Sequence, residues 1–298
     1  MVPNNQPLFS IIIPTFNRPE RLHSCLQSIS DLDNASDEIQ TIVVNDGSTL
    51  PYDNVIESFN DKLKLSYWEQ HNQGPAAARN RGADHAEGGF LVFLDDDCTL
   101  PSDWLHKMQT NVHRDFVVGG HTINCLTDNV FSRASQALID YLYGYYNSDT
   151  EQALFITSNN MIIPKQIYQQ VGGFDLDFSD AAAEDRDFCD RLLYSGYAIK
   201  YRPEITIHHY HHMKLRNYVK QHYKYGYSAR LFHRKRSNRN GNKLRIEPPH
   251  FYTDLLTFPL KNKLPRALTI ASLLVLSQVA NALGFFNAKL KTVTRFTR

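Results

Sequence analysis

The fold is decided by the stretch Phe90-Leu91-Val92-Phe93-Leu94-Asp95-Asp96-Asp97-Cys98, in which an apolar run of strand length ends in three consecutive carboxylates. A strand that is buried on both faces can present charges only at its end. Three adjacent acids would repel one another there unless a cation binds between them. The stretch therefore predicts a buried strand with a divalent metal at its carboxyl end. The alternative is an acidic turn that caps a following helix at Pro101.

The residues around this stretch alternate between β-branched runs and amphipathic stretches from Phe9 to about Phe116, which is typical of βαβ units. We expect strands at 9–14, 40–45, 63–68 and 90–94, and helices at 18–29 and 75–86. The carboxyl ends of parallel strands share one edge of a sheet, where ligands bind. The polar strand ends at residues 14–18, 45–48 and 95–97 are therefore expected to converge on one cleft.

After Phe116 the alternation loosens. A strand is expected over Phe155–Ile163, and a helix over Glu184–Tyr194 that ends before Gly196. We expect this half to bind the second substrate. Residues 230–245 contain seven Lys or Arg and no acid, with Asn and Gly between them, which indicates a solvated arm or loop.

Composition excludes some functions. The chain has 298 residues, 42% of them hydrophobic, which is enough for one large α/β domain with an extension. A net charge of +1, and a basic run in which Phe232 is the only Phe, Tyr or Trp, argue against nucleic-acid binding. The four cysteines are scattered without a C-x-x-C pair, and residues 1–7 contain no signal-peptide pattern, so we expect a reducing, cytoplasmic setting.

The acidic tip suits a metal-bound diphosphate. On an extended backbone Asp95 and Asp97 would point the same way and Asp96 the other way. Their oxygens suit Mg²⁺ or Mn²⁺. Asp46 could accept a hydrogen bond from a ribose hydroxyl or a base N–H, although Asp-Gly-Ser is also an ordinary turn. Arg79 could meet a phosphate or base, although a surface arginine without a partner is the plainer interpretation.

A second source of ligands is the run Ile205-Thr206-Ile207-His208-His209-Tyr210-His211-His212. If the run is extended, Ile205, Ile207, His209 and His211 share a face, and the two isoleucines indicate that this face points inward. His209 is then the better candidate to reach the metal, and imidazole with carboxylate suits Mn²⁺ better than Mg²⁺. The alternatives are a separate zinc site made by the four histidines, or a surface cluster of titrating histidines.

Four ordered motifs carry a family resemblance: Ile12-Ile13-Pro14-Thr15-Phe16-Asn17-Arg18, Val43-Val44-Asn45-Asp46-Gly47-Ser48, Gln73-Gly74-Pro75-Ala76-Ala77-Ala78-Arg79-Asn80-Arg81-Gly82-Ala83 and Phe93-Leu94-Asp95-Asp96-Asp97. In this order and spacing they resemble the family 2 glycosyltransferases of the GT-A fold. The later Gly172-Gly173-Phe174-Asp175 and Glu184-Asp185 resemble the acceptor-side pattern of that family. The resemblance covers roughly residues 8–226.

The resemblance implies an α/β fold of the GT-A type, a Rossmann-like, mixed but mostly parallel sheet flanked by helices, with a C-terminal helical extension. The expected catalytic domain is 1–226, with a nucleotide-sugar donor half at about 8–115 and an acceptor half at about 116–226. Residues 227–298 are then a basic linker and an apolar helical extension.

The resemblance also implies roles for single residues. The segment that holds the uracil and ribose of a UDP-sugar corresponds to Pro14, Thr15, Phe16, Asn17, Arg18 and Asp46, and a base or phosphate contact to Arg79. Asp95 and Asp96 correspond to donor contacts, Asp97 to the metal ligand, and His209 to a further ligand or donor contact. Asp185 corresponds to the general base, and Glu184 to a contact with the acceptor or donor sugar. Ala183 stands where many relatives carry Gly.

The chemistry of such a transfer asks for these residue types. Displacement at the anomeric carbon needs a carboxylate that deprotonates the acceptor hydroxyl, opposite the leaving diphosphate. It also needs a cation to absorb the charge of that leaving group. The plainer interpretation of Glu184-Asp185 is an acidic first turn that the helix dipole stabilises. We therefore expect an inverting, metal-dependent transferase that moves a sugar from a nucleotide-sugar to a hydroxyl of a glycan or lipid carrier. The expected donor is a UDP-sugar.

Other classes stay open at this point. A nucleotidyltransferase could use a similar sheet and metal but would release pyrophosphate. A non-catalytic nucleotide-sugar binding protein would bind UDP with Mn²⁺ and show no donor hydrolysis. A Rossmann dehydrogenase is disfavoured because no G-x-G-x-x-G follows the first strand.

The C-terminal part contains an uncharged stretch, Ala267–Phe286, of the length of a bilayer core, although Ser272, Ser277, Gln278 and Asn281 reduce its apolarity. Together with the basic run 230–245, the cations Lys261, Lys263 and Arg266 would suit an anionic leaflet. We expect residues 264–286 to attach the protein to the cytoplasmic face of the inner membrane, as a span or as a helix in the interface. The alternative is a helix that packs on the catalytic domain or forms a homodimer interface.

Overall fold

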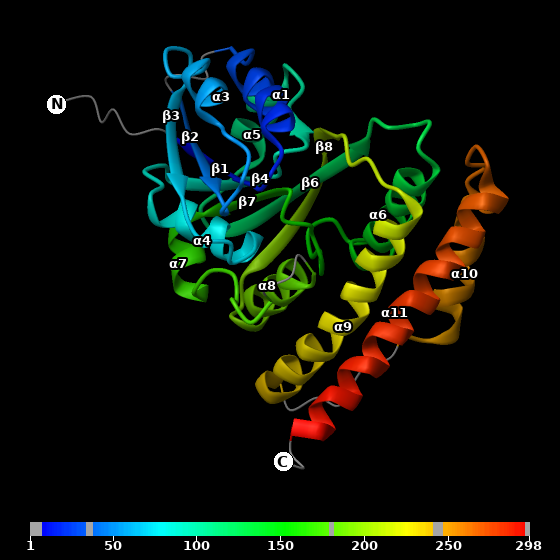
Figure 1. Cartoon of the computed structure of the whole chain (residues 1–298). Helices are drawn as coiled ribbons and strands as arrows, with labels where there is room; N and C mark the ends of the chain where they lie inside the picture. The colour runs from blue at the N-terminus through cyan, green and yellow to red at the C-terminus, as the bar shows by residue number, and fades with distance from the viewer. Residues whose placement is uncertain (1–7, 34–37, 179–181, 241–246, 296–298) are drawn as a thin grey trace. The chain divides into compact units, whose positions relative to one another are not determined.

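The computed structural model describes residues 8–33, 38–178, 182–240 and 247–295, except for the side chains of residue 240 and residues 289–295. These residues belong to two compact units. Figure 1 shows the chain coloured by residue number. Unit 1 comprises Met1–Ile123 and Asp149–Tyr210, and unit 2 comprises Asn124–Ser148 and His211–Arg298. The expected division into a catalytic domain 1–226 and an extension 227–298 stays a prediction, because compact units state which residues pack together and not which fold alone.

Unit 1 is built on an eight-stranded sheet of order β3-β2-β1-β4-β7-β6-β8-β5. The strands are β1 Phe9–Thr15, β2 Ile39–Asn45, β3 Lys64–Glu69, β4 Phe90–Leu94, β5 Cys98–Thr99, β6 Phe116–Asn124, β7 Asn160–Pro164 and β8 Ala198–His209. The neighbours among β3, β2, β1 and β4 are parallel, whereas β7 is antiparallel to both β4 and β6, and β5 to β8. The carboxyl ends of β1, β2 and β4 therefore lie at one edge, as predicted.

Helices cover both faces of this sheet because its central strands are apolar on both sides. In β1, Ile11 and Ile13 pack into one hydrophobic cluster and Ile12 into the other. The first cluster includes residues of α1 Pro19–Ser30 and α5 Trp104–Asn111, with α3 Asp53–Glu57 packed against it. The second includes residues of α4 Pro75–Asp84, α7 Lys165–Val171 and α8 Glu184–Tyr194. The predicted α/β fold is confirmed.

Two sequence predictions in unit 1 differ in length from the structure. The helix predicted at 75–86 ends at Asp84. The strand predicted at Phe155–Ile163 begins only at Asn160, because residues 157–159 form a turn in which Thr157 Oγ1 donates to Asn159 Oδ1 at 2.7 Å. Leu94 pairs with Asn160, so this turn lies beside the carboxyl end of β4, at the same edge of the sheet.

Unit 2 is helical and consists, within the described residues, of α6 Val130–Tyr146, α9 Leu215–Asn240, α10 Pro249–Lys261 and α11 Ala267–Arg295. Its core gathers Tyr141, Tyr218, Phe251, Leu255 and Leu274. The helices α9 and α11 run side by side (Figure 1).

The approach of α9 to α11 is unusually close. A Cβ atom placed on Gly226 would lie 1.8 Å from the carbonyl oxygen of Asn281. One placed on Gly284 would lie 2.0 Å from the carbonyl oxygen of Tyr223. Small residues at these two positions let the two backbones touch.

The prediction that residues 230–245 form a solvated arm is wrong for residues 230–240, which are the last turns of α9. Lys and Arg are good helix formers, and the buried Phe232 fixes this part of the helix in the unit. Residues 241–245 lie outside the described residues.

The apolar C-terminal stretch is helical, as predicted. Within the described residues, Ala267–Ala288 is long and apolar enough to cross a membrane by length and composition, and 28% of its most apolar window is buried. Contact with a membrane stays a prediction at this point.

Candidate active site

The acidic tip is a turn and not an extended segment. Immediately after β4, the N–H of Cys98 donates to the carbonyl oxygen of Asp95 at 3.1 Å. The prediction that Asp95 and Asp97 point the same way is therefore wrong, because the alternation of side chains holds only for extended backbone. Asp96 and Asp97 instead share one cation, Arg18, and Asp95 contacts another, Arg79.

Asp96 is held by the end of β1 and the start of α1. Its Oδ2 accepts a hydrogen bond from Thr15 Oγ1 at 2.8 Å, and its Oδ1 lies 3.0 Å from Arg18 Nη1. Burial raises the pKa of this carboxyl to about 6, against the opposing effect of the Arg18 charge. The sequence predicted Thr15, Arg18 and Asp96 as one donor-side group, and the structure brings them together.

Asp97 lies among three basic side chains. Its Oδ2 is 3.2 Å from Arg18 Nη1 and 3.3 Å from Arg21 Nη1, and its Oδ1 is 3.2 Å from His209 Nε2. Arg21 also donates to the carbonyl oxygen of Tyr210 at 2.6 Å. Positive charges at the N-terminus of a helix interact unfavourably with the helix dipole. Arg18 and Arg21 lie at the start of α1, and the carboxylates of Asp96 and Asp97 offset this effect.

Sequence reasoning missed Arg21. A signal was available, because Arg18 and Arg21 are three residues apart at the start of a predicted helix and such residues lie on one face.

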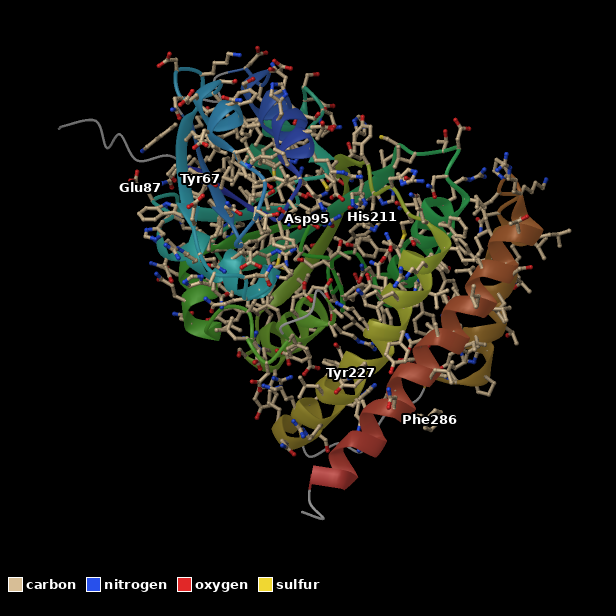
Figure 2. The ribbon with its side chains drawn as sticks, viewed as in Figure 1. Tyr67, Glu87, Asp95, His211, Tyr227 and Phe286 are labelled. Atoms are coloured by element: carbon tan, nitrogen blue, oxygen red, sulfur yellow. The ribbon has the colours of Figure 1, made fainter. Side chains whose placement is uncertain are left out.

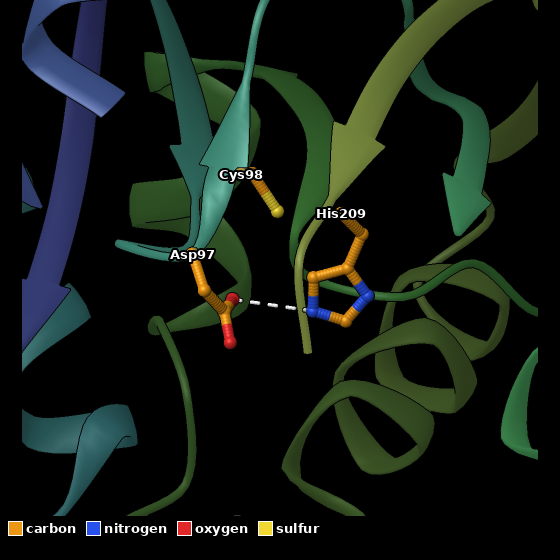
Figure 3. Close-up of side chains that lie close together, drawn as sticks. All are labelled: Asp97, Cys98 and His209. Atoms are coloured by element: carbon orange, nitrogen blue, oxygen red, sulfur yellow. Dashed lines mark ion pairs between the residues drawn. The ribbon is translucent and has the colours of Figure 1, made fainter. Parts of the chain in front are cut away.

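The residues at the end of the tip fit a divalent cation. Ligand atoms of Asp97, Cys98 and His209 lie within 4.8 Å of one another (Figure 3). Two ligands of one cation with bonds of about 2.1 Å lie about 3 Å apart, close to the Asp97–His209 separation of 3.2 Å. Burial raises the pKa of the Cys98 thiol well above its usual value, and a thiol is a soft ligand that suits Mg²⁺ or Mn²⁺ less well than an oxygen ligand does. The donor set is therefore one carboxylate and one imidazole.

The inward orientation predicted for His209 agrees with the structure. Ile205 and Ile207 are buried on β8, and His209 of the same strand reaches Asp97. Burial lowers the pKa of His209, but the hydrogen bond and the charge of Asp97 outweigh it, so the net shift is upward. The other three histidines of the run join no such group of ligands within the described residues, which gives no support to a four-histidine zinc site.

Arg79 connects the acidic tip to the acceptor-side pattern. It is buried, and its Nη2 lies 2.7 Å from Asp95 Oδ1 while its Nη1 lies 3.1 Å from Glu184 Oε1. Its guanidinium also stacks over the ring of Phe174, 5.6 Å from the centroid. The plainer interpretation of Arg79 as a surface arginine is wrong, because two carboxylates from distant parts of the chain hold it inside.

Glu184 and Asp185 begin α8. The residue before them, Ala183, has φ of 70°, a left-handed conformation that Gly adopts more easily. Burial and the charge of Asp185 raise the pKa of Glu184 to about 7, although Arg79 opposes the shift. Burial also raises the pKa of Asp185, against the N–H of Arg186, which donates to its Oδ1 at 2.7 Å. The pair can therefore accept a proton near neutral pH, as a general base requires.

The carboxylate of Asp46 holds a loop in place. Its Oδ1 accepts from Gln70 Nε2 at 2.8 Å and from the N–H of Gln73 at 2.9 Å, and its Oδ2 accepts from the N–H of Gly74 at 2.8 Å. Its own N–H donates to the carbonyl oxygen of Thr15 at 2.9 Å, so it lies beside the donor-side segment. Its contact with a nucleotide stays a prediction.

The rest of the first motif joins the ends of β1 and β2. The backbone N–H of Asn17 donates to Ser48 Oγ at 2.8 Å, and Asn17 Oδ1 accepts from the N–H of Thr49 at 2.8 Å. Phe16 is 45% exposed and Pro14 is partly exposed. Their predicted donor contacts remain predictions, as do those of the other site residues.

Sequence reasoning also missed Tyr52, which organises this corner. Its Oη accepts from the N–H of Arg18 at 2.8 Å and lies 2.9 Å from Thr15 Oγ1. Tyr52 is buried just before α3, outside every motif, so no pattern in the sequence indicated it.

The chain is similar in sequence to known glycosyltransferases. Residues 10–172 match the family described as Glycosyl transferase family 2, and residues 146–216 match the one described as N-terminal domain of galactosyltransferase. The pre-mycofactocin glycosyltransferase of Mycobacterium tuberculosis is 26% identical over 238 residues, 74% of this chain and 46% of that protein. The GalNAc(5)-diNAcBac-PP-undecaprenol beta-1,3-glucosyltransferase of Campylobacter jejuni is 32% identical over 126 residues, 41% of this chain and 39% of that protein.

The chain thus spans less than half the length of these relatives. In fold it is similar to the mannosyltransferase PcManGT from Pyrobaculum calidifontis, solved in complex with GDP-Man and Mn²⁺, with a TM-score of 0.62 and 19% identity over 99% of this chain and 81% of that one. This likeness confirms the predicted GT-A fold. Because the first family match covers more than half of its residues, the chain belongs to glycosyl transferase family 2.

Proposed function

We propose that this protein transfers a sugar from a nucleoside diphosphate donor, a UDP-sugar, to a hydroxyl group of a carbohydrate or lipid-linked acceptor. The observation that carries the proposal is the buried Arg79, which joins Asp95 of the acidic tip to Glu184 of the acceptor-side pattern. A transferase must hold the leaving diphosphate and the base that deprotonates the acceptor in the same active site. The names of the relatives, a glucosyltransferase with a lipid-linked substrate among them, support the same class of reaction.

The donor side is assigned to the acidic tip. Asp97 and His209 would hold a divalent cation, Mn²⁺ or Mg²⁺, and this cation supplies neutralisation of the leaving diphosphate when it is bound. Arg18 and Arg21 stand beside the same carboxylate and add positive charge where a diphosphate would bind. The uracil and ribose are assigned to residues 14–18 and Asp46, with Arg79, Asp95 and Asp96 as further donor contacts.

The acceptor side is assigned to the start of α8. Asp185 takes the proton of the acceptor hydroxyl, and its raised pKa makes it a better base than an ordinary aspartate. Glu184, fixed by Arg79, contacts the acceptor or donor sugar. A base that assists direct attack from the face opposite the diphosphate gives inversion at the anomeric carbon.

The donor is tested first, by thermal shift with Mn²⁺ and a panel of UDP-sugars and GDP-mannose. A ligand that binds the native state raises the melting temperature. We expect a UDP-sugar to stabilise the protein and to yield UDP on incubation with an acceptor. Stabilisation by GDP-mannose alone would overturn the choice of nucleotide, and release of pyrophosphate would indicate a nucleotidyltransferase.

The base is tested with Asp185→Asn. We expect turnover to fall by about a hundredfold or more, because general base catalysis contributes at least that much, while the donor-induced thermal shift is kept. The matched control is Asp84→Asn, at an exposed position at the end of α4, which should leave both unchanged. Near-normal turnover of Asp185→Asn would remove the base assignment. Proton NMR of the product's anomeric signal checks inversion.

A cytoplasmic location is part of the proposal. All four cysteines are free thiols, and Cys25, Cys98 and Cys189 are buried. Free thiols of this kind are typical of a reducing compartment.

A further inference from the structure

The exposed face of α11 is apolar along its length. The buried side of the helix includes Ile270, Leu274 and Ser277. On the opposite side, Leu268, Val275, Val279, Leu283 and Phe286 are between 47% and 73% exposed. The remaining exposed residues between 267 and 288 are Thr269, Ser272 and Ala282, so this face contains no charge. We call the five large residues the apolar stripe.

Such a stripe is unexpected for a helix that faces water. The members are seven, four, four and three residues apart, which places them on one side of a helix. Figure 2 shows Phe286 projecting from α11 on the side away from α9. A helix at the surface of a soluble protein normally turns charged residues outward, and a contiguous exposed apolar patch marks an interaction site.

Basic residues stand at both ends of the stripe. Before its start, Lys263 and Arg266 are exposed, and Lys261 pairs with Asp254 at 2.7 Å. Near its end, the rings of His233 on α9 and Phe285 on α11 are 6.3 Å apart, so the last turns of α9 accompany this part of α11. Residues 230–240, which form those turns, contain no acid. They contain five cations: Arg230, Arg234, Lys235, Arg236 and Arg239.

We propose that unit 2 binds the surface of an anionic lipid bilayer, with the apolar stripe in the interface and the exposed Lys263 and Arg266 at its start against the headgroups. Apolar residues on one face and Lys or Arg beside them are the pattern of helices that lie in the membrane plane. Each Lys or Arg near an anionic leaflet adds an electrostatic attraction to the membrane surface.

The packing of α11 favours lying on the membrane over crossing it. Tyr218 Oη donates to the carbonyl oxygen of Leu273 at 3.0 Å, and the backbones of α9 and α11 touch at Gly226 and Gly284. A spanning α11 would lose these contacts or draw the many cations of α9 into hydrocarbon, where each is costly. A helix in the interface keeps every contact that its buried side makes.

A second copy of the chain is the competing occupant. Helices that pair through an apolar seam carry charges beside it, which fix partner and register. The positions beside this stripe are uncharged between 267 and 288. Two copies would also bring like-charged basic ends together in a parallel pair. Lipid headgroups, in contrast, complement those charges.

The test uses the full-length protein and sedimentation with vesicles of phosphatidylcholine, with and without phosphatidylglycerol. We expect binding to the anionic vesicles, little binding to neutral ones, and a decrease as salt rises. Phe286→Glu should weaken binding by about tenfold or more, because a carboxylate cannot enter the apolar interface. Leu268→Glu tests the other end of the stripe. The control is Thr253→Glu, at an exposed position of α10, which should bind like the wild type.

The assay is independent of catalysis, so it stands whether or not the proposed activity is found. Circular dichroism checks that each variant keeps its helices, and Lys263→Glu, which leaves the stripe intact, should weaken binding to anionic vesicles only. Wild-type protein that does not sediment with anionic vesicles overturns the proposal, as does undiminished binding by both stripe variants. A dimer that Phe286→Glu dissociates, without vesicle binding, assigns the stripe to a second copy. Resistance to alkaline carbonate extraction assigns it to a membrane span.

Discussion

The buried carboxyl of Glu184 leads to a prediction about stability. Its pKa is about 7 in the folded protein, compared with an ordinary value of 4.5, mainly because it is buried. An acid whose pKa rises on folding binds its proton more tightly in the folded state, so its contribution to stability is complete below pH 4.5 and is lost as pH rises to about 7. Glu184→Gln removes the titrating group and keeps nearly the same shape.

The magnitude follows from the shift. Each unit of pKa corresponds to about 1.4 kcal/mol, so the rise from 4.5 to about 7 corresponds to about 3 kcal/mol. We therefore expect the free energy of unfolding of Glu184→Gln, minus that of the wild type, to be about 3 kcal/mol larger at pH 8 than at pH 4, which means that the variant gains stability relative to the wild type as pH rises. The attraction between ionised Glu184 and Arg79 is already contained in this shift, because it opposes the effect of burial. Transfer activity should fall if Glu184 contacts a sugar.

The measurement is urea unfolding of both proteins from pH 4 to pH 8. The control is Glu57→Gln, at an exposed position of α3, whose difference from the wild type should be far less dependent on pH. If the difference between Glu184→Gln and the wild type stays constant within about 0.5 kcal/mol across this range, the argument that burial perturbs Glu184 is refuted.

Substitutions at three further positions test other parts of the structure. Tyr52→Phe leaves the N–H of Arg18 without its acceptor, so urea unfolding should show a loss of about 1–2 kcal/mol, and the KM for the donor should rise; an unchanged stability would contradict the role of Tyr52. Gly284→Leu forces α11 away from Tyr223 and should lower stability by about 3 kcal/mol, measured as a lower melting temperature, whereas an unaltered melting curve would mean that the two helices do not touch. Ala183→Val places a β-branched residue at φ 70° and should cost more than about 1 kcal/mol in urea unfolding, while Ala183→Gly should be nearly neutral; equal stabilities would exclude the left-handed conformation.

Local patterns predicted the first four strands of unit 1 and the helices α1, α4 and α8. The strands at 9–14, 40–45 and 63–68 were each within one residue of the structure at both ends, and the strand at 90–94 and the helix Glu184–Tyr194 agree at both ends. These elements are bounded by residues that act locally, such as Pro19 at the start of α1 and Gly196, with φ of 85°, after α8. In the basic run the pattern failed, because the charges of residues 230–240 gave no sign of the neighbour against which Phe232 packs.

The site was predicted as a set of residues, but not as a set of contacts. The sequence placed Asp95, Asp96 and Asp97 at the end of a strand, and the family resemblance supplied their roles. Which cation faces which carboxylate depends on the turn after Leu94, and that turn separated Asp95 from its two neighbours. Asp46 was expected to face a ligand, and its carboxylate holds the loop before α4.

The sequence by itself determined the alternation of strands and helices up to β4, the acidic tip and the family resemblance, because periodicity, caps and short motifs are local properties of the chain. Only the tertiary structure decided that Arg79 joins Asp95 to Glu184, that Arg21 and Tyr52 belong to the site, and that α11 turns an uncharged face outward. These features depend on contacts between residues far apart in the chain, and such contacts follow from how strands and helices pack.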